Sequence, residues 1–176
     1  MYFEELNSIT RQHMLDEFEQ EEIGSNPYRG RLLSPEGNNA FPNLMRRAIL
    51  SGNEQTLILS LMHSQYWQPV EHYSKGMRRI NFQQQAERLG LSEFNTWYIR
   101  GLSKLLLQEG ATHCQVYRAA EPKGARETCS FYEGQTFLVE EVYKGHRAQY
   151  WPDPNPQAFS VPFGPNCHHT IRRCRP

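Results

Sequence analysis

Residues 81–110 read NFQQQAERLGLSEFNTWYIRGLSKLLLQEG, and this stretch has the strongest apolar periodicity in the chain. Ser92 is a good N-cap, because its hydroxyl can accept a hydrogen bond from an amide of the first turn, and Glu93 adds negative charge there. Gly110 stands where a left-handed residue would end a helix. Between them, apolar side chains recur at steps of three and four: Phe94, Tyr98, Leu102, Leu105 and Leu106. Trp97 widens this stripe, so the pattern predicts a helix that packs on more than one side.

The residues on the N-terminal side of this stretch predict further helices. These helices are expected at residues 1–23, 43–51, 54–62 and 82–89, with Asn53 as a cap and Gly90 as the end of the last one. Residues 70–80 are expected to form a connection. Residues 24–42 are rich in turn-forming residues, and their length favours either an extended arm or a plain surface loop.

The residues after Gly110 have a different character. Alternation predicts a strand at 114–118, and residues 128–132 and 135–143 read as a hairpin that turns at Glu133 and Gly134. Short strands are also expected at 159–161 and 168–172. The sequence thus predicts an α+β fold, a helical N-terminal part followed by a small β-rich C-terminal part. The helical domain covers residues 1–110 with the arm at 24–42, and the β-rich domain covers 111–176 with a Pro-rich loop at 150–165.

The net charge of the 176 residues is zero, which excludes a global bias toward nucleic acid or membranes. The charge is nevertheless uneven, because residues 1–23 are acidic and residues 144–176 are basic. Opposite ends of this kind suit head-to-tail contact between copies, or form two solvated surfaces. The basic tail TIRRCRP, residues 170–176, could contact phosphate non-specifically or remain a solvated terminus.

Targeting signals are not evident in the sequence. No run of about 18 apolar residues exists, so no membrane-spanning helix and no membrane partner are expected. The first residues, MYFEELNS, lack the basic and then apolar pattern of a signal peptide. A cytosolic origin is expected, in which cysteines are thiols or metal ligands.

A structural zinc site is one candidate for the cysteines and histidines of the β-rich part, and the alternative is that this part has no cofactor. Zinc takes four such donors in a tetrahedron. The candidate ligands are Cys114, Cys129, Cys167, Cys174, His168 and His169, and the last four lie in or beside the dense segment CHHTIRRC. No CxxC pair is present, so buried thiols and histidines bonded to the backbone are the competing interpretation.

Two other interpretations come from the same residues. The segment AERLGLSEFNTWYIRG, residues 86–101, has the two helices and the glycine turn of a helix-turn-helix DNA reader. Its second helix, however, offers mainly bulky apolar groups where a groove-facing helix should be basic. An enzyme that uses zinc or a Cys–His pair is the third interpretation, although Cys167 and His168 are adjacent and catalytic partners usually meet through the fold.

Three segments resemble proteins of tailed bacteriophages. SEFNTWYIRGLSKLLLQEG, residues 92–110, resembles a helix of phage virion proteins. The segments CSFYEGQTF, residues 129–137, and PFGPNCHHT, residues 162–170, resemble the C-terminal end of Mu-type minor head proteins, whose Cys, acidic-Gly turn, aromatic and Pro-Asn-Cys occur here in order. The CxxC of that family is missing from this chain, and the helical domain of this chain is shorter than that of the family.

The resemblance implies a virion structural protein of the head–tail connector, as an adaptor or neck protein, made in the host cytoplasm. It implies a ring-like homo-oligomer that contacts portal and tail or neck proteins, with non-specific contact to packaged DNA and no catalytic activity. The over-wide apolar helix is then expected to supply part of the contact with neighbouring subunits. The residues expected at this interface are Phe94, Trp97, Tyr98 and Arg100.

Overall fold

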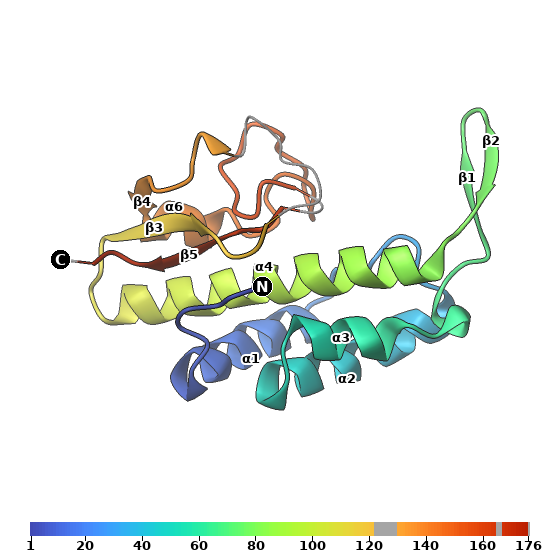
Figure 1. Ribbon diagram of the computed structural model, residues 1–176, viewed down its shortest axis with the longest axis horizontal. Coiled ribbons are helices and arrows are strands. Elements are labelled where there is room, and N and C mark those ends of the chain that lie inside the picture. The colour runs from blue at the N-terminus through green and yellow to red at the C-terminus, as the bar shows by residue number, and fades with distance from the viewer. Residues whose placement is uncertain (122–129, 165–166, 176) are drawn as a thin grey trace.

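The structure is a computed structural model, and it describes residues 1–121, 130–164 and 167–175. Figure 1 shows one long helix with shorter helices on one side and a small sheet on the other. The helices are α1 (Ser8–Glu22), α2 (Pro35–Ser51), α3 (Glu54–Leu61), α4 (Phe82–Gln108) and α6 (Val139–Lys144). The strands are β1 (Val70–Tyr73), β2 (Gly76–Arg79), β3 (His113–Arg118), β4 (Thr136–Leu138) and β5 (His169–Arg173). The α+β class is confirmed, with helices first and most strands later.

The long helix α4 runs without interruption for 27 residues, so the predicted break at Gly90 and the predicted cap at Ser92 are both wrong. The helix begins at the Asn81 cap, whose side chain accepts from the Gln84 amide. Gly90 serves close packing, because a Cβ there would lie 3.0 Å from the backbone nitrogen of Ile58 on α3. The helix-turn-helix interpretation loses its turn, since residues 86–101 form one straight element.

Helix α4 is buried on two sides. Helices α1 and α3 pack along one side, while β5 and α6 pack on the other (Figure 1). Phe94 and Tyr98 are fully buried, and Trp97 is 1% exposed. These side chains therefore form the core of this chain and present no surface to a second subunit. The prediction that they contact neighbouring subunits is corrected accordingly. Arg100 is also occupied, by Glu17 and by the Tyr143 carbonyl.

The predicted arm at 24–42 is shorter than expected, because α2 begins at Pro35. Ser34 caps this helix by accepting from the Gly37 amide at 3.0 Å, and proline is favourable in the first turn. The remaining loop is pinned to the body, since Leu33 forms an isolated bridge with Trp67 and is 2% exposed. The second predicted cap, Asn53, is confirmed as a capping box at the start of α3.

The predicted connection at 70–80 is a β-hairpin that projects beyond the end of α4 (Figure 1). Its strands pair antiparallel, with Glu71 opposite Arg78 and His72 opposite Met77. Gly76 has a φ of +143°, which favours glycine at the turn. Nearly all of the hairpin's side chains are exposed, Glu71 being the buried exception.

The second sheet has the order β4–β3–β5, with both pairs antiparallel. Strands at 114–118 and 168–172 were predicted within one residue of their observed bounds. The predicted strand at 135–143 is wrong beyond Leu138, because Val139 and Val142 turn into α6 and are both buried at helical spacing. Residues 131–134 form a turn, residues 128–129 lie outside the described part, and 159–161 is not a strand.

One hydrophobic cluster extends from Met14 on α1 to Ile171 on β5, with α4 between them. Its members come from both predicted parts of the chain. Among the described residues, no helix has the length and apolar character needed to cross a bilayer.

Candidate functional site

The predicted metal ligands fall into two separate groups. Cys114 lies opposite Arg173 on the sheet, so the next residue, Cys174, is its neighbour, and burial together with Cys174 raises the pKa of Cys114 to about 12. His169 lies opposite Arg118, four residues from Cys114 along β3, which corresponds to roughly 13 Å. The prediction that all of these donors converge is therefore wrong for Cys114 and Cys174.

The second group consists of Cys167, His169 and Glu133. The Cys167 sulfur lies 3.5 Å from His169 Nδ1, and His169 Nε2 lies 3.5 Å from a Glu133 oxygen. A tetrahedral zinc ion with Zn–S of about 2.3 Å and Zn–N of about 2.0 Å would separate two such ligands by roughly 3.5 Å. Cys167 and His169 thus fit two ligand positions, and Glu133, whose same oxygen accepts from Arg118 at 2.8 Å, lies near the other ring nitrogen of His169.

The other predicted donors do not complete this group. Cys129 lies outside the described residues, and His168 faces the backbone at Ala120, with its pKa lowered mainly by burial. Within the described part of the chain, no three His, Cys, Asp or Glu side chains gather closely enough to hold a metal. Cys167 is 5% exposed, whereas a nucleophilic cysteine must be reached by its substrate. Cys167 is therefore better suited to bind a metal or to make a structural contact with His169 than to act as a nucleophile.

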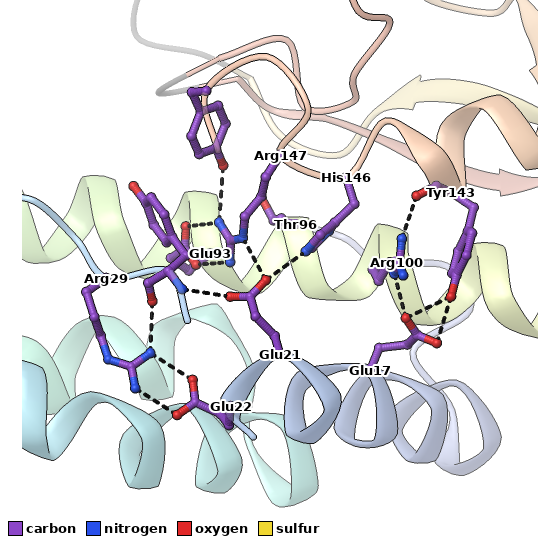
Figure 2. A network of polar contacts seen from close by, with 12 residues as sticks. Glu17, Glu21, Glu22, Arg29, Glu93, Thr96, Arg100, Tyr143, His146 and Arg147 are labelled. Atoms are coloured by element: carbon purple, nitrogen blue, oxygen red, sulfur yellow. Dashed lines mark hydrogen bonds and ion pairs between the residues drawn. The ribbon is translucent and has the colours of Figure 1, made fainter. Parts of the chain in front are cut away.

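A buried ion pair, which sequence reasoning missed, links α4 to the segment after α6 (Figure 2). Arg147 donates to both carboxylate oxygens of Glu93 at 2.9 and 2.6 Å, and the two side chains are 2% and 3% exposed. The guanidinium lies 4.3 Å from the centre of the Tyr28 ring and donates to the Tyr150 hydroxyl at 3.1 Å. Burial alone would lower the pKa of Arg147, but Glu93 outweighs it and raises that pKa.

The acidic residues of α1 extend this pair into a network (Figure 2). One oxygen of Glu21 lies 3.4 Å from both Arg147 Nε and His146 Nε2. Burial favours the neutral imidazole and lowers the pKa of His146 to about 4. Burial would raise the pKa of Glu21, but His146 and Arg147 together lower it to about 2. At neutral pH, Glu21 and Arg147 are therefore charged and His146 is neutral.

Two further ion pairs continue along the same face of α1. Glu17 accepts from Arg100 at 2.6 Å and from the Tyr143 hydroxyl at 3.0 Å. Glu22 accepts from Arg29 at 2.7 Å through both oxygens. The spacing of Glu17 and Glu21, four residues apart on one helical face, is a signal present in the sequence. It could have suggested that these acids face the rest of the chain rather than solvent.

The network positions segments and holds fixed charges. It joins α1, α4 and residues 143–150 through groups whose pKa values lie away from neutrality. A hollow of about 210 Å³ adjoins it, lined by Tyr28, Glu93 and Tyr150 among others, but Arg147 already occupies the Glu93 carboxylate. The network therefore holds α1, α4 and residues 143–150 together by ion pairs and hydrogen bonds.

The oppositely charged ends of the chain also meet within one molecule. Glu4 accepts from Arg172 at 2.6 Å and from Arg175 at 2.8 Å, and Glu5 accepts from the Arg173 backbone amide. The basic tail is therefore neutralised by the acidic N-terminus of its own chain. Of the alternatives that the sequence left open for the charged ends, head-to-tail contact between copies and tail contact with phosphate would both have to compete with these intramolecular ion pairs.

The chain matches no family model, no curated protein and no solved structure.

Proposed function

We propose that the chain is a structural protein of a tailed-phage virion, an adaptor or neck protein of the head–tail connector that acts by assembly. The observation that carries the proposal is the compact unit formed by the described residues that resemble Mu-type minor head proteins. These residues come from two segments more than twenty residues apart, and a shared structural role explains their occurrence together.

Aromatic stacking holds this unit together. Phe137 stacks on Phe159 with ring centroids 4.5 Å apart, and Tyr132 stacks on Phe163 at the same separation. Phe163 in turn contacts His169 at 5.9 Å, beside Cys167. Gly134 has a φ of +81°, so glycine is favoured at the turn that precedes Phe137. The residues of the motif thus pack together beside β4 and β5 and have a structural role. Such a role is in keeping with a protein that acts by assembly.

The contact surface between copies must lie away from α4, whose apolar side chains are used internally. Leu59 of α3 and Met62, the C-cap residue that follows this helix, are 64% and 37% exposed. They form an exposed apolar face at the C-terminal end of α3. We assign this face to the contact between neighbouring copies of a ring, with portal and tail or neck proteins above and below it.

The test is the assembly state of the purified protein, alone and co-expressed with the portal protein of the same genome. Native mass spectrometry and light scattering should show a closed homo-oligomer or a complex with the portal protein. Leu59→Glu combined with Met62→Glu should reduce assembly to monomers, whereas the exposed control Ile23→Glu should assemble as the parent does. A chain that stays monomeric at high concentration and binds no portal or tail protein would refute the proposal.

We also propose that Cys167 and His169 bind a structural zinc ion, on the basis of the 3.5 Å between their donor atoms. Zinc measured by elemental analysis should accompany the purified protein in stoichiometric amount. Cys167→Ser should lose the metal, and Cys174→Ser, whose site lies beyond the other end of β5, should retain it. Metal-free parent protein with unchanged thermal stability after zinc addition would exclude the site.

A further inference from the structure

The lysine and arginine side chains that lack a carboxylate partner are concentrated in one part of the described structure. Most of its lysine and arginine side chains contact carboxylates, and Arg11 contacts the carbonyls that end α2. Among the described residues, the cationic side chains that have no such partner are Arg47, Lys75, Arg79 and Arg88. All except Arg47 lie on the β1–β2 hairpin or at its base on α4.

Two hollows flank the base of this hairpin. The first, about 250 Å³, is lined by three arginines, Arg31, Arg78 and Arg88, together with Trp67 and Ser92 among others. The second, about 560 Å³, is lined by Arg79, Trp67, Phe82 and several amides. Trp67 lines both hollows, which therefore adjoin each other at the base of the hairpin.

The local charge balance is strongly positive. Glu71 is the buried acid of the hairpin, and it is already shared by Arg31 and Arg78. Glu87 is the other acid between residues 64 and 92. Against these two acids the same range holds four cations, Lys75, Arg78, Arg79 and Arg88, and Arg31 adds a fifth from the loop before α2. An anionic partner would gain charge neutralisation here, whereas most of the other described cations are already paired with carboxylates.

We propose that the β1–β2 hairpin and the hollows at its base bind the phosphate backbone of a nucleic acid. Lys75, Arg79 and Arg88 provide the free charges, and Arg31 and Arg78 are held in place by Glu71. A two-stranded ribbon fits the major groove of duplex DNA, and Phe82, which lines the larger hollow, also suits a stacked base of a single strand. The shared chemistry is a row of phosphodiesters, read without sequence specificity. The inference depends on charge and geometry, and it stands independently of the proposed virion role.

The test measures binding of a fluorescent 20-base-pair duplex and of the matching single strand by anisotropy over a range of salt. The combined variant Lys75→Ala, Arg79→Ala and Arg88→Ala should bind about tenfold or more weakly. The slope of log affinity against log salt should fall by roughly 2 to 3, because each lost phosphate contact removes about 0.9. Arg47→Ala, the unpaired arginine on α2, is the matched control and should bind as the parent does.

Further measurements separate this proposal from other anions. A double variant of the exposed pair, Lys75→Glu and Arg79→Glu, keeps the test valid if the Arg88 change disturbs α4. Unchanged affinity in both variants, or equal loss in Arg47→Ala, would overturn the proposal. Equal or tighter binding of polyglutamate would instead indicate an acidic protein partner. Saturation by submillimolar inorganic phosphate would indicate a small-anion site.

Discussion

Arg147 concentrates several interactions on a single side chain. Its backbone is in the left-handed region, with a φ of 55°, and its guanidinium is shared among Glu93, Glu21, Tyr28 and Tyr150. No local pattern in the sequence around GHRAQY marks this residue, because its partners lie on α1, on the loop after α1 and on α4. Only the fold brings these distant acids to it.

Replacing Arg147 with Met should lower the free energy of unfolding by about 3 to 5 kcal/mol, because the Glu93 carboxyl group would remain buried without its partner. Urea denaturation measures this change. The matched control is Lys144→Ala, which removes an exposed pair with Glu140 and should cost under about 0.5 kcal/mol. A similar small loss for Arg147→Met would mean that water or a rearranged side chain satisfies Glu93.

His146 should make the protein sensitive to mild acid. Burial holds its pKa at about 4 in the folded state, against 6.5 for the free side chain, while Glu21, Arg147 and Arg100 also face it. The unfolded chain therefore takes up a proton first as the pH falls below 6.5, and stability decreases down to about pH 4. The expected loss between pH 7.5 and pH 5 is about 2 kcal/mol.

Urea titrations at the two pH values test this dependence. His146→Gln removes the titrating group, so its stability should change less between them than that of the parent. The exposed His72→Gln should behave as the parent does. A parent protein equally stable at both pH values would contradict the buried neutral imidazole.

At the scale of elements, local sequence patterns predict some elements and miss others. Periodicity predicts the C-terminal half of α4 and the strands β3 and β5, and capping chemistry predicts the Asn53 cap of α3. Gly90 could not be interpreted locally, because a glycine at a helix end and a glycine at a close helix crossing look alike. The hairpin at 70–80 was missed because both of its faces are exposed and its strands do not alternate.

Gly101 should be as restricted as Gly90. A Cβ at this position would lie 2.6 Å from the backbone nitrogen of Met14, so α1 would have to move. Gly101→Ala should therefore destabilise the protein by about 1 to 2 kcal/mol, overpacking outweighing the gain in helix propensity. Thermal unfolding measures the change, with the exposed Gln84→Ala on the same helix as control. A stabilised Gly101→Ala protein would show that α1 and α4 are less closely packed.

At the scale of the whole molecule, the two ends of the chain close over the same region. Phe3 packs against Phe94 and Tyr98 of α4, with ring centroids 5.4 and 4.7 Å away, and the Tyr2 amide donates to the Ala119 carbonyl. The candidate site could be predicted only in part from sequence. Cys167 and His169 are among the ligands that the sequence suggests, whereas most of the ion pairs at this site, Glu22 with Arg29 excepted, join residues more than fifty positions apart.

The N-terminal segment should thus contribute directly to stability. Phe3→Ala is expected to reduce the free energy of unfolding by about 2 to 3 kcal/mol, below the cost for a fully buried Phe because Phe3 is only partly buried. Tyr2→Ala is the matched control, since that side chain is 70% exposed and its backbone contact survives the change. Equal denaturation midpoints for the two variants would show that the segment adds little to the core.

The pairing of Glu4 and Glu5 with Arg172 and Arg173 also sets an order of events during synthesis. The partners are 168 residues apart, so the first acids leave the ribosome long before the arginines that neutralise them. Until β5 emerges, one side of α4 lacks part of its cover, and the nascent chain exposes apolar surface to its neighbours. A ribosome that stalls before His169 would release a chain prone to aggregate, whatever the stability of the finished protein.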